Sequence, residues 1–379
     1  MIPLARITGI RITLDPSWFI IFLLVAYSLA SDLLPEQLPG TSAAIRWVLA
    51  SVLALALFAS VLAHEFAHAL VARARRVNVD EIMLFLFGGV AKLKGEPRDA
   101  LSEFLIAVAG PLLSIVLGLS LLGLVDAIGA AAPPALQTGL WWLGVINVAL
   151  ALFNLVPGFP LDGGRILRAI LWWRMGDFER ATVAAARVGQ GIAGLLIAVG
   201  IFFTLSTGSL SWLWEAVIGW FLWSAASRSI RIARLRDAVE GTTVRELMTD
   251  RVPAIRADQD VRSGLAQASV IPAADELAVI ERDGALAGVV TQAALAEAVA
   301  ADPRRPAREI ATAPAAEQVL SPSAPAEDLI ARLAGIGQRL LLIVEDGRLL
   351  GTVDPRALLA ALRDAETQSR AEARDITSP

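Results

Sequence analysis

The sequence contains no cysteine and only two histidines among its 379 residues. Disulfide bonds, thiolate metal sites and thiol nucleophiles are therefore excluded, and any metal ion must be bound by His, Asp, Glu or Asn. Charged residues are scarce as well, at 18% against about 25% in soluble domains. Because 56% of the residues are hydrophobic, the composition predicts a membrane protein. No nucleic-acid partner is expected.

Long apolar runs dominate the first part of the chain, residues 1–238. A helix needs about 20 apolar residues to cross a bilayer, so each run predicts one span and the set predicts a domain of six transmembrane helices. The first run lacks a small-residue cleavage site after it and is expected to remain in the mature protein. The runs are centred on Phe19–Ala30, Val48–Val71, Leu105–Val125, Leu140–Leu155, Ile192–Leu205 and Leu213–Ala226.

Lys and Arg residues cluster in alternate connections between the spans. Positive charge marks the cytoplasmic side of short loops, so both termini are predicted to be cytoplasmic and the protein to span the cell (inner) membrane several times. The clusters are Arg73, Arg75, Arg76, Lys92, Lys94 and Arg98; Arg174, Arg180 and Arg187; and Arg228, Arg231, Arg234 and Arg236.

Residues 239–365 repeat themselves with an offset of 63: "LAVIERDGALAGVV" at Leu277 returns as "LLLIVEDGRLLGTV" at Leu340. Each copy, about 244–301 and 307–364, reads as strand, Asp-Gly turn, strand and helix. The sequence therefore predicts two α+β units in tandem on the cytoplasmic side. Residues 366–379 have no apolar pattern and are expected to be disordered.

This repeat resembles a pair of cystathionine-β-synthase-type (CBS) domains. The resemblance implies regulation of activity or assembly, binding of an adenine nucleotide, and pairing of two chains into a homodimer. The family often places Ser or Thr, then an acid three residues later, after the second strand. Here Thr291 is followed by Ala294, and Asp354 by Ala357, so a tethering or dimerisation module without a ligand stands as an alternative.

Both histidines of the chain lie inside the second apolar run, in "HEFAH". Residues four apart share one face of a helix, so the imidazoles of His64 and His68 can reach one metal ion, with Glu65 beside them. H-E-x-x-H is a zinc-protease signature. A glutamate at bilayer depth is costly and points to function, so the sequence predicts one zinc ion per chain, with a structural histidine pair as the plain alternative.

A third zinc ligand must be a carboxylate, because no other His or Cys exists. Asp162, in "FNLVPGFPLDGGRIL", follows two prolines that interrupt the fourth run, and broken backbone at membrane depth lines a cavity or is buried in protein. Arg73 follows His64 by about 13 Å of helix, and Arg165 follows Asp162 closely, so the depths of the two residues agree. The alternative for Asp162 is an N-cap of a helix that begins at Gly163 or Gly164.

Two further features lie between these motifs. The segment "EIMLFLFGGVAKLKG" predicts a membrane-associated β-hairpin around Phe87, Gly88 and Gly89, whose open edge could pair with an extended substrate strand; a purely structural connecting hairpin is the alternative. Glu103 is expected to be an acid of a first helical turn, where acids are favoured.

Together, "HEFAH", "FGGVAKL", "AGPLLS" and Asn-x-x-Pro-x-x-Pro-Leu-Asp-Gly resemble the site-2 protease family of intramembrane zinc metalloproteases, in its six-span form with C-terminal CBS domains. The resemblance covers essentially the whole chain. It implies that His64, His68 and Asp162 bind zinc, that Glu65 is the catalytic carboxylate, and that Asn154 positions the substrate or the oxyanion. The substrate would be a single-span membrane protein cut within the bilayer, in regulated intramembrane proteolysis.

Two other functions are compatible with parts of the sequence. A CBS-gated transporter or channel would also have intramembrane acids and broken helices, but it has no reason to place its only two histidines in a zinc motif. A zinc-binding membrane scaffold without activity would contain the same ligands. The presence of Glu65 between the histidines favours the protease.

Overall fold

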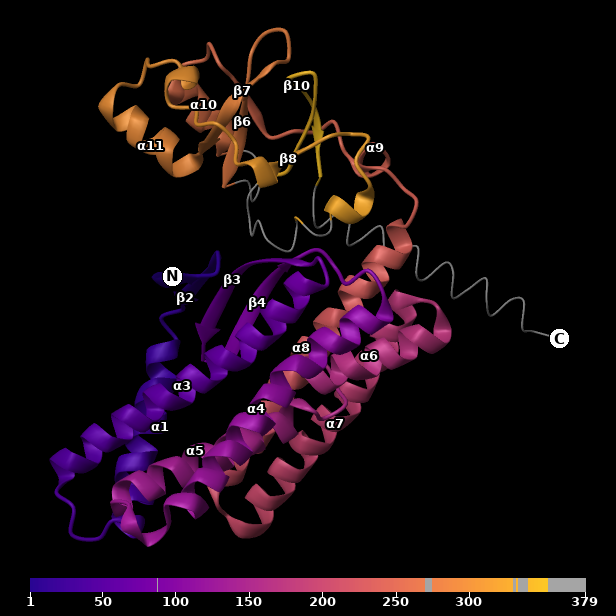
Figure 1. The fold of residues 1–379 in the computed structure, drawn as a ribbon. Coiled ribbons are helices and arrows are strands. Elements are labelled where there is room, and N and C mark those ends of the chain that lie inside the picture. Colours follow the sequence, from indigo (N-terminus) through magenta and orange to yellow (C-terminus); the bar gives the residue numbers. More distant parts are fainter. Residues whose placement is uncertain (87, 270–274, 330–331, 333–339, 354–379) are drawn as a thin grey trace. The chain divides into compact units, whose positions relative to one another are not determined.

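The computed structural model describes residues 1–86, 88–269, 275–329, 332 and 340–353. The chain divides into two compact units, Met1–Ala233 and Arg234–Pro379. The first is built of long helices with one small sheet, and the second has two small sheets with short helices (Figure 1). The division falls inside helix α8, Leu213–Val239.

Five helical segments of the described residues are long and apolar enough to cross a membrane. The sixth expected span lies in α8, whose C-terminal half carries four arginines, and α8 is not one of the five. The prediction of several spans is therefore confirmed, and the number six is approximate. The five segments are Trp18–Gln37, which comprises α1 (Trp18–Ser28), a π-helical turn (Leu29–Leu33) and α2 (Leu34–Gln37), then α3 (Ala43–Ala74), α4 (Ala100–Ile128), α5 (Pro134–Asn154) and α7 (Phe178–Thr207).

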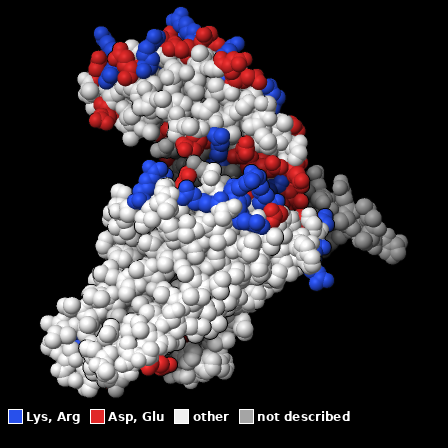
Figure 2. All heavy atoms as spheres, in the orientation of Figure 1, with Lys and Arg blue, Asp and Glu red and all other residues white. Residues whose placement is uncertain are grey.

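The sides of these helices are apolar where the protein does not cover them. Leu23, Val52, Leu119 and Leu195 are more than half exposed, and the sides of the helical unit show almost no charged side chains in Figure 2. In water such surfaces would be a large hydrophobic patch, whereas lipid tails solvate them without cost. The helical unit therefore has the surface of a membrane domain.

A four-stranded sheet in the order β1-β2-β3-β4 accompanies the helices. β3 (Asn78–Phe85) and β4 (Gly88–Lys94) form the predicted hairpin, in which Leu84 pairs with Gly89. β2 runs parallel to β3 on its other side. β4 therefore lies at one edge of the sheet, as the substrate-edge hypothesis requires, and β1 lies at the other.

The two N-terminal strands, β1 (Ile2–Ile7) and β2 (Ile10–Leu14), were not anticipated from the sequence. Ile10, Ile12 and Leu14 are buried, and the alternation of apolar and polar residues in "IRITL" is the period-two sequence signal of a strand. The Thr13 hydroxyl also donates to Glu81 at 2.8 Å, which links β2 to β3. The N-terminal segment thus completes the sheet ahead of the first span.

Small residues bring α4 and α5 close together. A Cβ added to Gly118 would lie 2.8 Å from the carbonyl oxygen of Gly144, and one added to Gly144 would lie 3.1 Å from that of Gly118. Close backbone approach through small residues replaces the hydrophobic effect as the force that packs helices in lipid. This packing fixes α4, which lines the site described below.

The second unit contains the same strand arrangement twice. β5 (Ala254–Arg256) runs parallel to β6 (Glu276–Ile280), which pairs antiparallel with β7 (Leu286–Thr291). The second sheet repeats this order with β8 (Val319–Leu320), β9 (Leu342–Glu345) and β10 (Arg348–Thr352). The tandem α+β prediction is confirmed.

Turns and short helices connect the strands of this unit. Both predicted Asp-Gly turns have a glycine with positive φ, Gly284 at 85° and Gly347 at 78°, as tight hairpin turns require. The helix expected near Pro355, with Asp354 and Ala357, and the tail 366–379 lie outside the described residues, as does Phe87. Among the described residues, α-helices that lie wholly inside this unit include α9 (Val244–Leu247), α10 (Val261–Ala268) and α11 (Gln292–Ala301).

Candidate metal centre

Helix α3 presents both histidines toward the protein interior. His64 and His68 are buried, at 3% and 4% exposure, and their Nε2 atoms lie 3.2 Å apart. The i, i+4 spacing places the two rings on one face of the helix, edge to face with ring centroids 4.8 Å apart. The sequence-based expectation that the imidazoles converge is met by this geometry.

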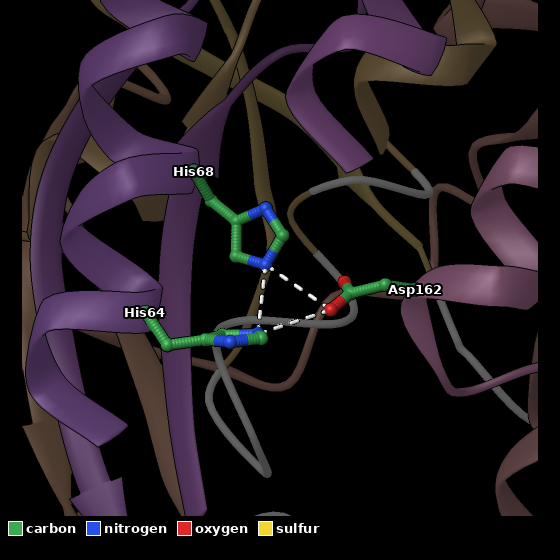
Figure 3. A group of neighbouring side chains, drawn as sticks. All are labelled: His64, His68 and Asp162. Atoms are coloured by element: carbon green, nitrogen blue, oxygen red, sulfur yellow. Dashed lines mark hydrogen bonds and ion pairs between the residues drawn. The ribbon is translucent and has the colours of Figure 1, made fainter. Parts of the chain in front are cut away.

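Asp162 meets the two imidazoles from a separate helix, α6 (Asp162–Met175). Its Oδ2 lies 3.1 Å from His64 Nε2 and 3.2 Å from His68 Nε2. Figure 3 shows the three side chains pointing to one common point, two from α3 and one from α6. Residues 94 and 98 positions apart in the chain therefore offer three ligand atoms within 4.8 Å of one another.

The outer nitrogens of both imidazoles are bound by α4. His68 Nδ1 lies 2.6 Å from the carbonyl oxygen of Ile106, which can only accept, so Nδ1 carries the proton and Nε2 of the neutral ring keeps a free lone pair. His64 Nδ1 lies 2.9 Å from the Ser114 hydroxyl. Outer hydrogen bonds orient metal-ligating histidines, and the bond to an acceptor-only carbonyl also fixes the tautomer, as it does for His68.

A closely packed loop places Asp162 at this point. A Cβ on Gly163 would lie 2.3 Å from the carbonyl oxygens of Leu155 and Val156, and one on Gly164 would lie 2.4 Å from the backbone of Gly158. The loop thus folds back directly onto the first turn of α6, which only glycines allow. This is the structural role of the glycines in "PLDGGR".

The N-cap alternative for Asp162 is wrong. The N-cap position is Leu161, and α6 begins at Asp162 itself. The backbone amides of Gly164 and Arg165 donate to the Leu161 carbonyl, so the Asp162 carboxylate is not used as a cap. It is directed to the histidines instead.

The residues present fit a zinc ion. Two imidazole nitrogens and one carboxylate oxygen are a donor set that leaves a fourth position open for water or substrate. Three electron-rich atoms within hydrogen-bonding distance in a buried place repel one another unless a cation or protons lie among them. Gly110 of α4 leaves the space, since a Cβ there would lie 2.2 Å from His68 Nε2 and 2.5 Å from His64 Nε2.

Glu65 follows His64 directly in the chain, but its side chain contacts the hairpin. Its side chain packs against Gly89 of β4, where an added Cβ would lie 2.4 Å from Glu65 Cγ and 3.2 Å from Oε1. The absence of a side chain at Gly89 therefore gives the carboxylate its place between α3 and the edge strand. The structure thus brings Glu65 and Gly89 together. Gly88, the first residue of β4, has a φ of 125°.

Asn154 is the last residue of α5. Its side-chain amide donates to the carbonyl of Leu150 at 3.0 Å, one turn earlier on the same helix. The amide nitrogen of Asn154 is thus used within α5. Its expected role with the substrate is untested by this geometry.

The charges that surround α6 were missed from the sequence. Glu103 is fully buried and accepts from Arg165 at 3.1 and 3.4 Å and from Arg168. The expectation of a simple first-turn acid is therefore incomplete: Glu103 does lie in the first turn of α4, but it forms a buried ion pair with α6. Two arginines three residues apart in an apolar helix, "GGRILR", were the available signal.

Family models match both parts of the chain. Residues 52–132 and 121–199 match the model described as Peptidase family M50, and together they contain both histidines and Asp162. Residues 307–364 match the model of the CBS domain. The predicted resemblance of the second repeat to a CBS domain is thereby confirmed.

Several relatives align with most of the sequence. The zinc metalloprotease Rip3 of Mycobacterium tuberculosis is 35% identical over 383 residues, which cover 100% of this chain and 96% of the relative. The zinc metalloprotease sll0528 of Synechocystis is 41% identical over 254 residues, 67% of this chain and 66% of that protein. A solved structure, the site-2 protease from Methanocaldococcus jannaschii, is 31% identical and covers 60% of this chain and 94% of its own, with a TM-score of 0.43.

Proposed function

The chain belongs to peptidase family M50 and is a zinc metalloprotease, and from this premise we propose that it cuts peptide bonds within the membrane with His64, His68 and Asp162 as its zinc ligands. The observation that carries the proposal is the convergence of the three ligand atoms from α3 and α6 in a buried place. A transporter gives no reason for this donor set. An inactive scaffold would share the ligands but would not need Glu65 beside them.

Glu65 is the proton carrier of the proposed reaction. When bound, the zinc ion acts as a Lewis acid on a water molecule and on the scissile carbonyl. The Glu65 carboxylate accepts a proton as water attacks and delivers that proton to the leaving nitrogen. Its contact with Gly89 holds it on the side of the centre where β4 lies, so a substrate next to β4 would present its peptide bond between carboxylate and ligands.

The edge strand β4, which begins with Gly88 and Gly89, is the proposed substrate-binding element, together with Phe87, which precedes it in the sequence. A helical substrate hides its peptide bonds in intrahelical hydrogen bonds, and addition to a sheet edge would hold it extended. In a membrane an open edge is avoided unless something pairs with it. The substrate class that fits is a single-span membrane protein unwound near the cleavage point.

Cross-linking distinguishes this role from that of a connecting hairpin. A photo-reactive amino acid at Val90 of β4, which is 42% exposed, is expected to trap an uncut membrane-span substrate in the Glu65→Gln background. The matched control is the same amino acid at Leu4, 54% exposed on β1 at the opposite edge. Equal trapping at both positions, or trapping at Leu4 alone, would reject β4 as the substrate edge.

Asp162 is the ligand whose assignment depends most on the fold, because it lies 94 or more residues from the histidines. Asp162→Ala is expected to weaken zinc binding by about 100-fold or more, since it removes a direct ligand and even support around ligands costs 10- to 100-fold. Competition with a chromophoric chelator measures this. Asp177→Asn, at the partly exposed N-cap of α7, should bind zinc like the wild type.

In the proposed orientation the protein spans the cell membrane and both termini lie in the cytoplasm, because Lys and Arg cluster in the connections on that side. It places the second unit on the cytoplasmic side. Reporter fusions at the C-terminus and in the connection between α4 and α5 test this orientation. Activity of a periplasmic reporter at the C-terminus would contradict it.

The second unit is proposed to regulate activity or assembly, with an adenine nucleotide as the ligand and a homodimer as the assembly. Thr291, the hydroxyl position of the first repeat, already accepts from the amide of Ala294 at 3.1 Å as the N-cap of α11, and no acid follows at Ala294. Only weak nucleotide binding is therefore expected. Calorimetry with ATP, ADP and AMP on the full chain tests it, and binding that Thr291→Val leaves unchanged would remove this position from the site.

A further inference from the structure

A carboxylate of the membrane domain is buried completely and paired with two cations. Glu103, near the start of α4, is 0% exposed. Its two oxygens accept from Arg165 Nε at 3.1 Å and Arg165 Nη2 at 3.4 Å, and one of them also accepts from Arg168. A buried carboxylate stays charged only where cations and hydrogen bonds compensate its lost hydration. The ion pairs of Glu103 with the two arginines therefore hold α4 and α6 together.

The same face of α4 serves all parts of the metal centre. Glu103, Ile106, Gly110 and Ser114 are spaced by three and four residues, which places them in one row on a helix. Ile106 and Ser114 bind the Nδ1 atoms of His68 and His64. Gly110, which has no side chain, leaves room for the Nε2 atoms of both rings. α4 is thus the common support of the ligands from α3, and Glu103 is its contact to the helix that supplies the third.

Arg165 and Arg168 lie one and two turns after Asp162 on α6. The two-point contact of the Arg165 guanidinium with Glu103 fixes direction as well as distance. Arg168 is held further by the rings of Phe159 and Phe178, 5.0 and 4.6 Å from its guanidinium carbon. An anchored first turn of α6 gives the Asp162 carboxylate a fixed distance from α3.

We propose that Glu103 is a positioning residue that holds Asp162 at the zinc site by clamping Arg165 and Arg168 against α4. The inference rests on the proposed assignment of Asp162 as a zinc ligand. Glu103 touches neither the zinc nor the substrate and acts only through α6. Its removal should therefore affect the part of zinc binding that Asp162 provides and leave the part that the histidines provide.

Zinc affinity in two backgrounds tests the proposal. Glu103→Gln is expected to weaken zinc binding by about tenfold in the otherwise wild-type chain, as loss of an outer partner of a ligand does, and to have no further effect in the Asp162→Ala background. Arg165→Lys keeps the charge but loses the two-point contact and should show a smaller loss with the same dependence on Asp162. It serves as the second variant if Glu103→Gln does not fold.

The matched control is Asp99→Ala on the same helix. Asp99 is the N-cap of α4 and accepts from the Ser102 amide at 2.7 Å, so its replacement removes the cap but leaves the contact between Glu103 and Arg165 in place. Its zinc affinity should stay within about twofold of the wild-type value, which is clearly distinct from the tenfold loss expected for Glu103→Gln. Weakening by Glu103→Gln of equal size in both backgrounds, or none in either, would overturn the proposal. If Asp162→Ala itself left zinc affinity unchanged, the ligand assignment would fail, and this inference with it.

Discussion

Replacing Glu65 with glutamine is expected to reduce cleavage of a membrane-span substrate by about 10²- to 10⁴-fold, the range that a general acid–base contributes, while zinc stays bound. Glutamine keeps the size of the side chain and its contact with Gly89, but it cannot accept a proton from water. Because Glu65 is not one of the three converging ligand residues, the metal content should not change. Rate and zinc content are measured on the same preparation.

Glu36→Gln is the control for this variant. Glu36 is an exposed acid of α2, and its loss should change neither cleavage nor zinc. Loss of zinc in Glu65→Gln would place this residue among the ligands and contradict the division of roles proposed above. Full activity with full zinc would remove Glu65 from the mechanism.

Gly110→Ala is expected to weaken zinc binding by about 100-fold, the upper end of what loss of support around metal ligands costs. The added methyl group would lie 2.2 Å from His68 Nε2 and 2.5 Å from His64 Nε2, which no side chain can accept without displacing the imidazoles. The effect runs against helix propensity, because alanine stabilises a helix interior by roughly 0.5–1 kcal/mol relative to glycine.

The same substitution elsewhere on α4 isolates the cause. Gly123 has nothing within 4 Å of an added Cβ, so Gly123→Ala should bind zinc and cut substrate like the wild type and be slightly more stable. Chelator competition and thermal unfolding of both variants in the same detergent compare them. Unaltered zinc affinity in Gly110→Ala would show that the imidazoles do not converge beside this helix.

The local part of the metal centre follows from the sequence alone. The convergence of His64 and His68 needs only the period of a helix, and the membrane surface needs only composition. The absence of any other histidine and of cysteine required a carboxylate as the third ligand, and Asp162 was selected by the two prolines that interrupt the run before it and by its matching depth. These inferences use spacing along the chain or chemistry that every fold must satisfy.

Contacts between distant segments could not be predicted in the same way. Glu103 and Arg165 are 62 residues apart, and each has an ordinary reading by itself, as a first-turn acid and as a charge near a membrane interface. The contact of Glu65 with Gly89 depends on how the hairpin packs against α3. Both became visible only when the helices were placed in space.

The N-terminal sheet shows a different limit. The pattern of Ile10, Ile12 and Leu14 was present in the sequence, but five residues give little room to separate a strand from the start of a span. Pairing of β2 with β3, about 70 residues later in the chain by its Ile12–Ile82 register, decides the question. The apolar run Leu213–Ala226 also predicted a sixth span, but α8 carries four arginines in its C-terminal half and is not among the five membrane-capable helices.

The measurement that tests the central claim most directly is mass spectrometry of the products formed from a single-span fusion protein by the purified, zinc-loaded chain. The account predicts one zinc per chain and new termini inside or at the edge of the apolar segment, absent from the Glu65→Gln reaction. New termini confined to water-exposed flanks of the substrate, or an intact substrate despite bound zinc across several fusions, would contradict intramembrane hydrolysis at this centre.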